Sequence, residues 1–227
     1  MMKILEFKLF SPISPNVVST LIIVAVLAVV FTIAGLKIKK LNPAETPKGF
    51  LFLCVLLVDF FTNFLKDYIS GKRLDFFGPY LFTLILFLSV ANTSALFGLT
   101  PPLANIGVAM SFSVITFFMI KIAELKFQGV KNKLLGFLGP VKPLAPLMIP
   151  INLIGEVSTP FSMGLRLFVN LMSGVVMTAM VFAIVGFVGS ILAGVILHAM
   201  FDIFFGLIQA FVFFMLSTVN LSMASES

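Results

Sequence analysis

The stretch that decides the fold runs from Met148 to Val185 and reads MIPINLIGEVSTPFSMGLRLFVNLMSGVVMTAMVFAIV. Most of it is apolar, which is typical of a helix that crosses a membrane. It carries a single basic residue, Arg166, and a single acid, Glu156. A guanidinium in the middle of such a helix costs from about 3 kcal/mol to more than about 10. Arg166 is therefore either a residue that snorkels or pairs structurally or a fixed charge on an ion pathway, and the pattern favours the second.

Composition indicates a membrane protein. The chain of 227 residues is 60% hydrophobic and 11% charged, with a mean hydropathy of +1.17. Its net charge of +6 does not indicate a nucleic-acid partner, because the basic residues cluster in two loops beside apolar runs. One Cys and one His are too few for a metal cluster, and no catalytic triad, phosphate loop or CxxC motif occurs. We expect no cofactor, no bound metal and no covalent chemistry carried out by this chain alone.

The apolar runs predict an all-α integral membrane protein with one membrane domain, five spans and one interfacial amphipathic helix. A second full span at 50–70 is the alternative to the interfacial helix. The last two helices each have ~35 residues, or ~50 Å at ~1.5 Å per residue, so we expect a steep tilt. The predicted order is the N-terminal segment 1–15, a span at 16–36, the interfacial helix 48–70, spans at 77–97 and 103–122, and the long helices 148–185 and 190–221.

The basic residues predict the orientation. Loops 37–73 and 121–142 fall on the same side of a five-span chain, which places both in the cytoplasm. The N-terminus is then outside and the C-terminus inside, and a second full span at 50–70 would spoil this asymmetry. The basic residues of the two loops are Lys37, Lys39, Lys40, Lys48, Lys66, Lys72 and Arg73, and Lys121, Lys126, Lys131, Lys133 and Lys142.

Each long helix carries a polar stripe. At about 100° per residue, seven polar or small residues share one face of the first helix, with Glu156 at its edge. Close packing through small residues accounts for part of this stripe, but not for Arg166 or Asn170. The first stripe comprises Asn152, Gly155, Thr159, Ser162, Arg166, Asn170 and Ser173, and the second comprises His198, Asp202, Gly206, Gln209 and Asn220.

The second stripe holds a histidine and a carboxylate four residues apart, so their side chains can touch. Histidine gains and loses protons near neutral pH. A structural ion pair between Asp202 and Arg166 is the alternative use of that carboxylate. Because the first helix starts inside and the second outside, Asn152 and Glu156 lead inward while Asp202 and His198 lead outward. This arrangement predicts two offset half-paths separated by Arg166.

Three segments form a recognisable set: Pro150-Ile-Asn-Leu-Ile, Ser162-Met-Gly-Leu-Arg-Leu-Phe-Val-Asn170, and the last helix from Gln209-Ala-Phe-Val-Phe-Phe-Met-Leu-Ser onward. They resemble subunit a of bacterial F-type ATP synthases. Asn92 and the turn Gly98-Leu-Thr-Pro101 stand where the family has an Asn…Leu-Pro turn. The resemblance covers essentially the whole chain.

The resemblance implies a non-catalytic subunit of the bacterial inner membrane, in the lipid bilayer, with the c-subunit ring, the b-subunit stator stalk and the rest of the F1Fo complex as partners. Arg166 is then the essential arginine, which keeps the ring carboxylate ionised and blocks leakage between half-channels for H⁺ or Na⁺. Gln209 is its partner across the helix pair, and Asn170 lines the site. The outer half-channel uses Asp202.

Three positions depart from the family pattern. Val175 stands where many members have a Glu or His, Val169 replaces the Gly of Leu-Phe-Gly-Asn, and Asn105 stands where an Asp is frequent. The first departure leaves Asp202 to serve the outer half-channel with His198 or water, and it is also compatible with Na⁺ coupling. A self-contained secondary transporter or channel is the competing function, although no inverted repeat is evident. An intramembrane enzyme has no nucleophile–base pair placed for it.

Overall fold

A computed structural model describes residues 15–40, 47–69, 71–129 and 145–224, with the backbone alone at 72, 145–146 and 185–192. These residues form helices and turns, without strands. The α-helices are α1 (Pro15–Lys39), α2 (Phe50–Lys66), α3 (Lys72–Thr93), α4 (Ile106–Ala123), α6 (Ala145–His198) and α7 (Gly206–Met223). The 3-10 helices η1 (Ser94–Phe97) and η2 (Pro102–Ala104) and the π-helices η3 (Glu124–Gln128) and η5 (Ala199–Phe205) connect or extend them.

Within the described ranges, five helical segments are long and apolar enough to cross a membrane. They are Pro15–Lys39, Arg73–Phe97, Ile106–Gln128, Leu147–Ile184 and Ala193–Met223. The chain is therefore an all-α integral membrane protein. Helix α2 has 17 residues, fewer than the ~20 that a span needs, and it is not one of the five. Aromatic rings join it to the bundle, with Phe61 and Phe64 lying 5.7 and 5.9 Å from Phe214 of α7.

Hydrogen bonds bring distant segments together at the two ends of the bundle. At one end, Asn16 Nδ2 donates to the Pro101 carbonyl at 2.9 Å, so the start of α1 meets the turn between α3 and α4. At the other end, Ser222 Oγ donates to the Tyr68 carbonyl at 2.7 Å, and Gln128 Nε2 donates to the Met223 carbonyl at 3.1 Å. The end of α7 therefore lies beside described parts of both basic loops.

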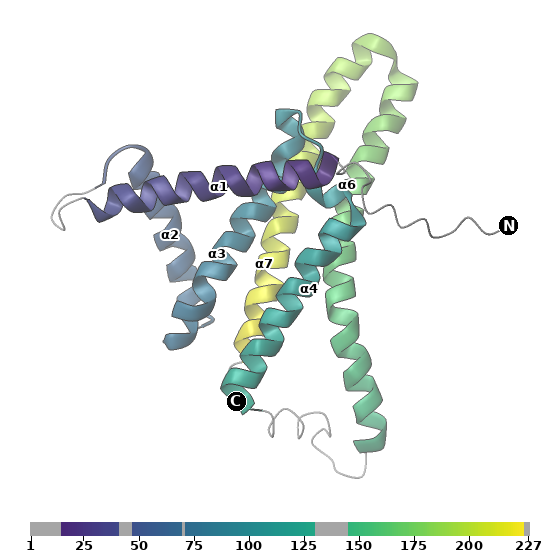
Figure 1. Cartoon of the computed structure of the whole chain (residues 1–227). Helices are drawn as coiled ribbons and strands as arrows, with labels where there is room; N and C mark the ends of the chain where they lie inside the picture. The colour runs from purple at the N-terminus through teal and green to yellow at the C-terminus, as the bar shows by residue number, and fades with distance from the viewer. Residues whose placement is uncertain (1–14, 41–46, 70, 130–144, 225–227) are drawn as a thin grey trace, which may run out of the picture.

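The chain reverses within α6, between the apolar segments Leu147–Ile184 and Ala193–Met223, and the resulting hairpin extends beyond the other helices at the top of Figure 1. Its two arms touch closely. A Cβ on Gly194 would lie 3.2 Å from Phe182 Cζ, and one on Gly174 would lie 3.1 Å from Phe201 Cβ. The 38 and 31 residues of these segments correspond to ~57 and ~46 Å of α-helix, well above the ~30 Å hydrocarbon thickness.

The predicted last helix, 190–221, is not α-helical throughout. Residues Ala199–Phe205 are π-helical, and α-helix resumes only at Gly206. The sequence did not predict this π-helical segment, because hydrophobic periodicity carries no signal for a local i→i+5 turn, which is short and depends on packing around it.

The two long arms pack on different neighbours, α6 along α4 and α7 along α3. Gly164 lets α6 approach α4 closely, because a Cβ there would lie 2.5 Å from Met110 Sδ and 3.2 Å from Met110 Cα. Ser113 Oγ of α4 also donates a hydrogen bond to the Pro160 carbonyl of α6. Helix α1 crosses the bundle at a large angle to α3, α4 and α7 (Figure 1), so the spans do not share one axis.

Candidate functional site

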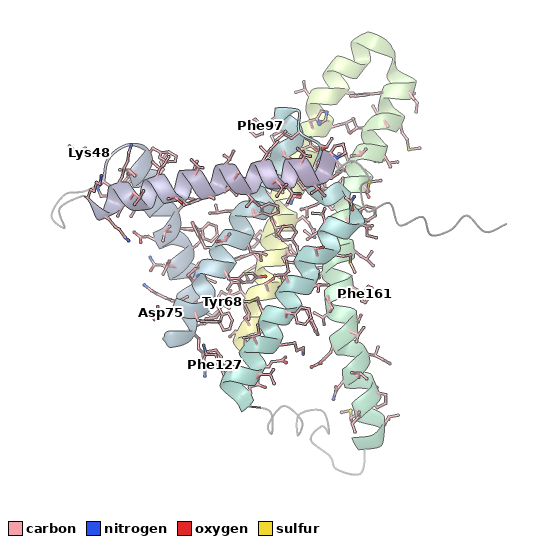
Figure 2. All side chains as sticks on the ribbon, in the orientation of Figure 1. Lys48, Tyr68, Asp75, Phe97, Phe127 and Phe161 are labelled. Carbon is pink, nitrogen blue, oxygen red and sulfur yellow. The ribbon has the colours of Figure 1, made fainter. Side chains whose placement is uncertain are left out.

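Arg166 lies on a face of α6 that the rest of the described chain leaves uncovered. Its side chain is exposed, as are Ser162 and Ser173. The buried face of the same helix consists of other residues, with Leu167 at 0% and Leu171 at 5% exposure. Arg166 forms no ion pair or hydrogen bond with the part of the chain that the structure describes. Its charged side chain therefore lies on the surface of the described chain. Phe161 also projects from the side of α6 turned away from α4 (Figure 2).

The carboxylate of Asp202 is paired with His198. His198 Nδ1 lies 2.6 Å from Asp202 Oδ2, and the side chains are 45% and 14% exposed. The i, i+4 contact predicted from the spacing is therefore present. In the described residues Asp202 forms no pair with Arg166, so the structural ion pair between them is not formed. The His198–Asp202 contact can pass a proton between an exposed imidazole and a more buried carboxylate.

Gln209 lies in the first turn of α7 and is partly buried. Its Nε2 atom is buried and has no hydrogen-bond partner among the described residues. No hydrogen bond joins Gln209 to Arg166 there, although the sequence predicted these two as partners. A buried amide without a partner costs free energy, so Gln209 Nε2 is an unsatisfied donor within the described residues.

The inward-leading residues meet a lysine that the sequence did not single out. Lys121 Nζ of α4 lies 2.6 Å from Glu156 Oε1 of α6 and 3.0 Å from Glu124 Oε2. Asn152, one turn before Glu156, is partly buried. Lys121 therefore neutralises the acid of the first stripe and ties α6 to the end of α4. The only sequence signal was the i, i+3 pair of Lys121 with Glu124.

Replacing Lys121 with methionine is expected to remove the ion pairs that Lys121 makes with Glu124 and Glu156. Partly buried ion pairs contribute on the order of 1 kcal/mol, so the assembled subunit should lose a few degrees of thermal stability. The test is the temperature at which detergent-solubilised subunit disappears from its size-exclusion peak. Lys37→Met, at the exposed end of α1, is the control and should cause no loss. An unchanged midpoint for Lys121→Met would contradict this role.

The remaining predicted positions fall at the edges of these clusters. Asn170 is partly buried one turn after Arg166, while Val169 and Val175 are exposed. Asn105 accepts a hydrogen bond from the Gly107 N–H at 2.8 Å and so caps α4. Among the described residues, no group of three or more His, Cys, Asp or Glu side chains could hold a metal ion.

Sequence reasoning also missed Asn92 as a functional candidate. This residue is 1% exposed, and its Nδ2 donates to the Gly206 carbonyl at 2.7 Å. The available signals were a polar residue near the end of an apolar span and its place in the family resemblance; neither indicates the partner, which lies 114 residues away along the chain.

The fold and these clusters define a multi-pass α-helical membrane protein with ionisable side chains inside its spans. The model of the ATP synthase A chain family matches residues 17–222, and the chain belongs to this family. It is similar to ATP synthase subunit a of Chlorobium phaeobacteroides, with 32% identity over 224 residues, 94% of this chain and 65% of the relative. ATP synthase subunit a 2 of Chlorobaculum tepidum is 32% identical over 225 residues, 94% of this chain and 63% of the relative. The chain thus spans just under two thirds of the length of these relatives.

Proposed function

We propose that this protein is the ion-translocating stator subunit of a rotary ATP synthase, carrying H⁺ or Na⁺ between two offset half-channels against a ring of c subunits. The partners in this proposal are the c-subunit ring, the b-subunit stalk and the rest of the F1Fo complex. The chain itself does no ATP chemistry, and its membership in the ATP synthase A chain family supports this assignment.

The observation that carries the proposal is the position of Arg166. A charge inside an apolar span persists where something compensates it, yet in the described residues Arg166 is exposed and unpaired. We infer that the compensating group belongs to another molecule. A carboxylate on a facing c-subunit helix fits, because arginine stays charged in poorly solvated sites and binds carboxylates with two parallel hydrogen bonds.

The two half-channels follow from the polar groups on either side of Arg166. Asp202 and His198 line the outer path, and Asn152 and Glu156 line the inner path, with Ser162, Asn170 and Ser173 on the ring-facing surface. The 2.6 Å contact between His198 and Asp202 supports an outer path built within one helix, which takes the place of the acid that Val175 does not provide. For the Gln209 amide to hydrogen-bond the ring carboxylate beside Arg166, its side chain must rotate, because Nε2 is buried within the described chain.

The charge pattern supports an orientation in a bacterial inner membrane. The end of the bundle where Tyr68, Gln128 and Met223 meet faces the cytoplasm, with the C-terminus. The start of α1 faces outward. In this orientation the long arms of the α6–α7 hairpin are steeply tilted, so that both lie along the ring.

One experiment separates this function from a self-contained transporter and also identifies the ion. Inverted vesicles containing the complex should take up ions when ATP is added, while liposomes containing the purified chain alone should show no driven solute uptake. In a K⁺ medium that is low in Na⁺, exchanging K⁺ for Na⁺ should stimulate ATP hydrolysis if the transported ion is Na⁺. The exchange should have no effect if the transported ion is H⁺. Solute uptake driven by the chain alone would overturn the stator assignment.

A further inference from the structure

Asn92 joins two parts of the bundle that are far apart in sequence. It lies in the last turn of α3, its side chain is 1% exposed, and its Nδ2 donates to the Gly206 carbonyl at 2.7 Å. A buried amide is costly unless it is hydrogen-bonded. Here the bond is made to a backbone carbonyl rather than to a side chain, so it constrains the path of the main chain at Gly206.

Gly206 is the junction between π-helical η5 and α-helical α7. The backbone at this point approaches α3 so closely that a Cβ on Gly206 would lie 3.0 Å from Asn92 Cβ. On the other side of η5, a Cβ on Gly174 of α6 would lie 3.1 Å from Phe201 Cβ. The π-helical segment is therefore held from two directions, by α3 at its end and by α6 near its start.

A π-helical turn contains one residue more than an α-helical turn. It therefore changes the direction in which side chains before it point relative to those after it. Asp202 lies inside η5 and Gln209 lies three residues beyond Gly206. Since π-helical turns are rare and mostly persist where their surroundings hold them, the contacts that hold η5 also set the angle between Asp202 and Gln209.

We propose that Asn92 is a positioning residue for ion translocation: its hydrogen bond to the Gly206 carbonyl holds the π-helical turn and so sets the direction of Asp202 relative to Gln209. The effect on transport rests on the proposed function above, whereas the effect on helix geometry does not. Without the bond, η5 relaxes toward a regular α-helix and Asp202 turns away from its place in the outer path.

The test compares Asn92→Ala and Asn92→Val with Thr93→Ala in the assembled complex. Both Asn92 replacements are apolar and therefore suit a membrane span. Assembly is verified by immunoblot, and activity is expressed per assembled subunit. Thr93 is a matched control, because its hydroxyl bonds only to Ser89 and Val90 carbonyls of its own helix. We expect ATP-driven ion uptake to fall at least ~10-fold in the Asn92 variants, since misplacement by about 1 Å costs up to ~100-fold, and to stay unchanged in Thr93→Ala.

A second measurement reports helix geometry directly. Spin labels at Val195 and Met223, which are 69% and 56% exposed, bracket η5, and Cys54 is replaced by alanine in a complex free of other cysteines. Loss of the π-helical turn should shift the label–label distance by about 1.5 Å or more, the rise of one α-helical residue, in the Asn92 variants only.

The outcomes separate this inference from the proposed function. Reduced uptake together with a shifted distance supports the role of Asn92. An unchanged distance, or uptake equal to that of Thr93→Ala, overturns it. Arg166→Ala is measured in parallel: if that variant pumps normally, the stator function fails, and the spin-label distance still decides whether Asn92 holds the π-helical turn.

Discussion

Replacing Arg166 with alanine is expected to abolish ATP synthesis while opening a passive ion leak through the membrane sector. The guanidinium is exposed on α6 without a partner in the described chain, so under the proposed function its removal leaves the facing ring carboxylate without a cation. Loss of a preorganised electrostatic contact of this kind reduces rates by on the order of 100-fold or more. With the fixed positive charge gone, the proposed function predicts that ions also pass directly between the two half-channels.

Both effects are measured on vesicles containing the complex. ATP synthesis is driven by an imposed ion gradient, and leak is followed as dissipation of that gradient after F1 has been removed. Leu165→Ala, an exposed neighbour on the same helix, is the matched control and should behave as wild type. Arg166→Lys keeps the charge but loses the paired hydrogen bonds, so it should block the leak better than alanine while still failing in synthesis. Normal synthesis by Arg166→Ala would refute the mechanism.

Replacing Asp202 with asparagine is expected to give the second largest loss. The substitution keeps the size of the side chain and removes its ability to carry a proton or hold a cation. A positioned proton-transfer group contributes ~100- to 10,000-fold in catalysis. Because water can partly replace the carboxylate, we expect a smaller reduction of ATP-driven uptake, ~10- to 100-fold. His198→Ala should cost less, because the His198 side chain is 45% exposed and water can substitute for it.

Asp59→Asn serves as the control for this prediction. Asp59 is an exposed acid on α2, away from the outer path, and its loss should leave uptake unchanged. Uptake is measured in inverted vesicles with a pH-sensitive dye and with radioactive sodium, so that either ion is detected. If Asp202→Asn pumps like Asp59→Asn, the outer path does not use this carboxylate.

The contrast between Asp202 and Glu156 illustrates how far spacing alone could predict contacts. His198 and Asp202 are four residues apart, and their contact follows from helical geometry. The contact of Glu156 with Lys121 joins α6 to α4 across 35 residues of sequence, and helix periodicity does not specify which residues of two helices face each other. The same reason explains why the sequence did not predict the contact of Asn92 with Gly206: the partner of Asn92 is a backbone carbonyl, which has no sequence signature.

The sequence by itself determined the membrane class, the apolar spans and the residues that carry charge within them, because hydrophobicity and helical periodicity are properties of each segment. Only the tertiary structure decided that Arg166 is uncovered, that Asp202 pairs with His198 rather than with Arg166, and that η5 is π-helical. These features depend on which helices pack together and how closely. Close approach at Gly164, Gly174 and Gly206 sets that packing, and it is the sum of many contacts between distant residues.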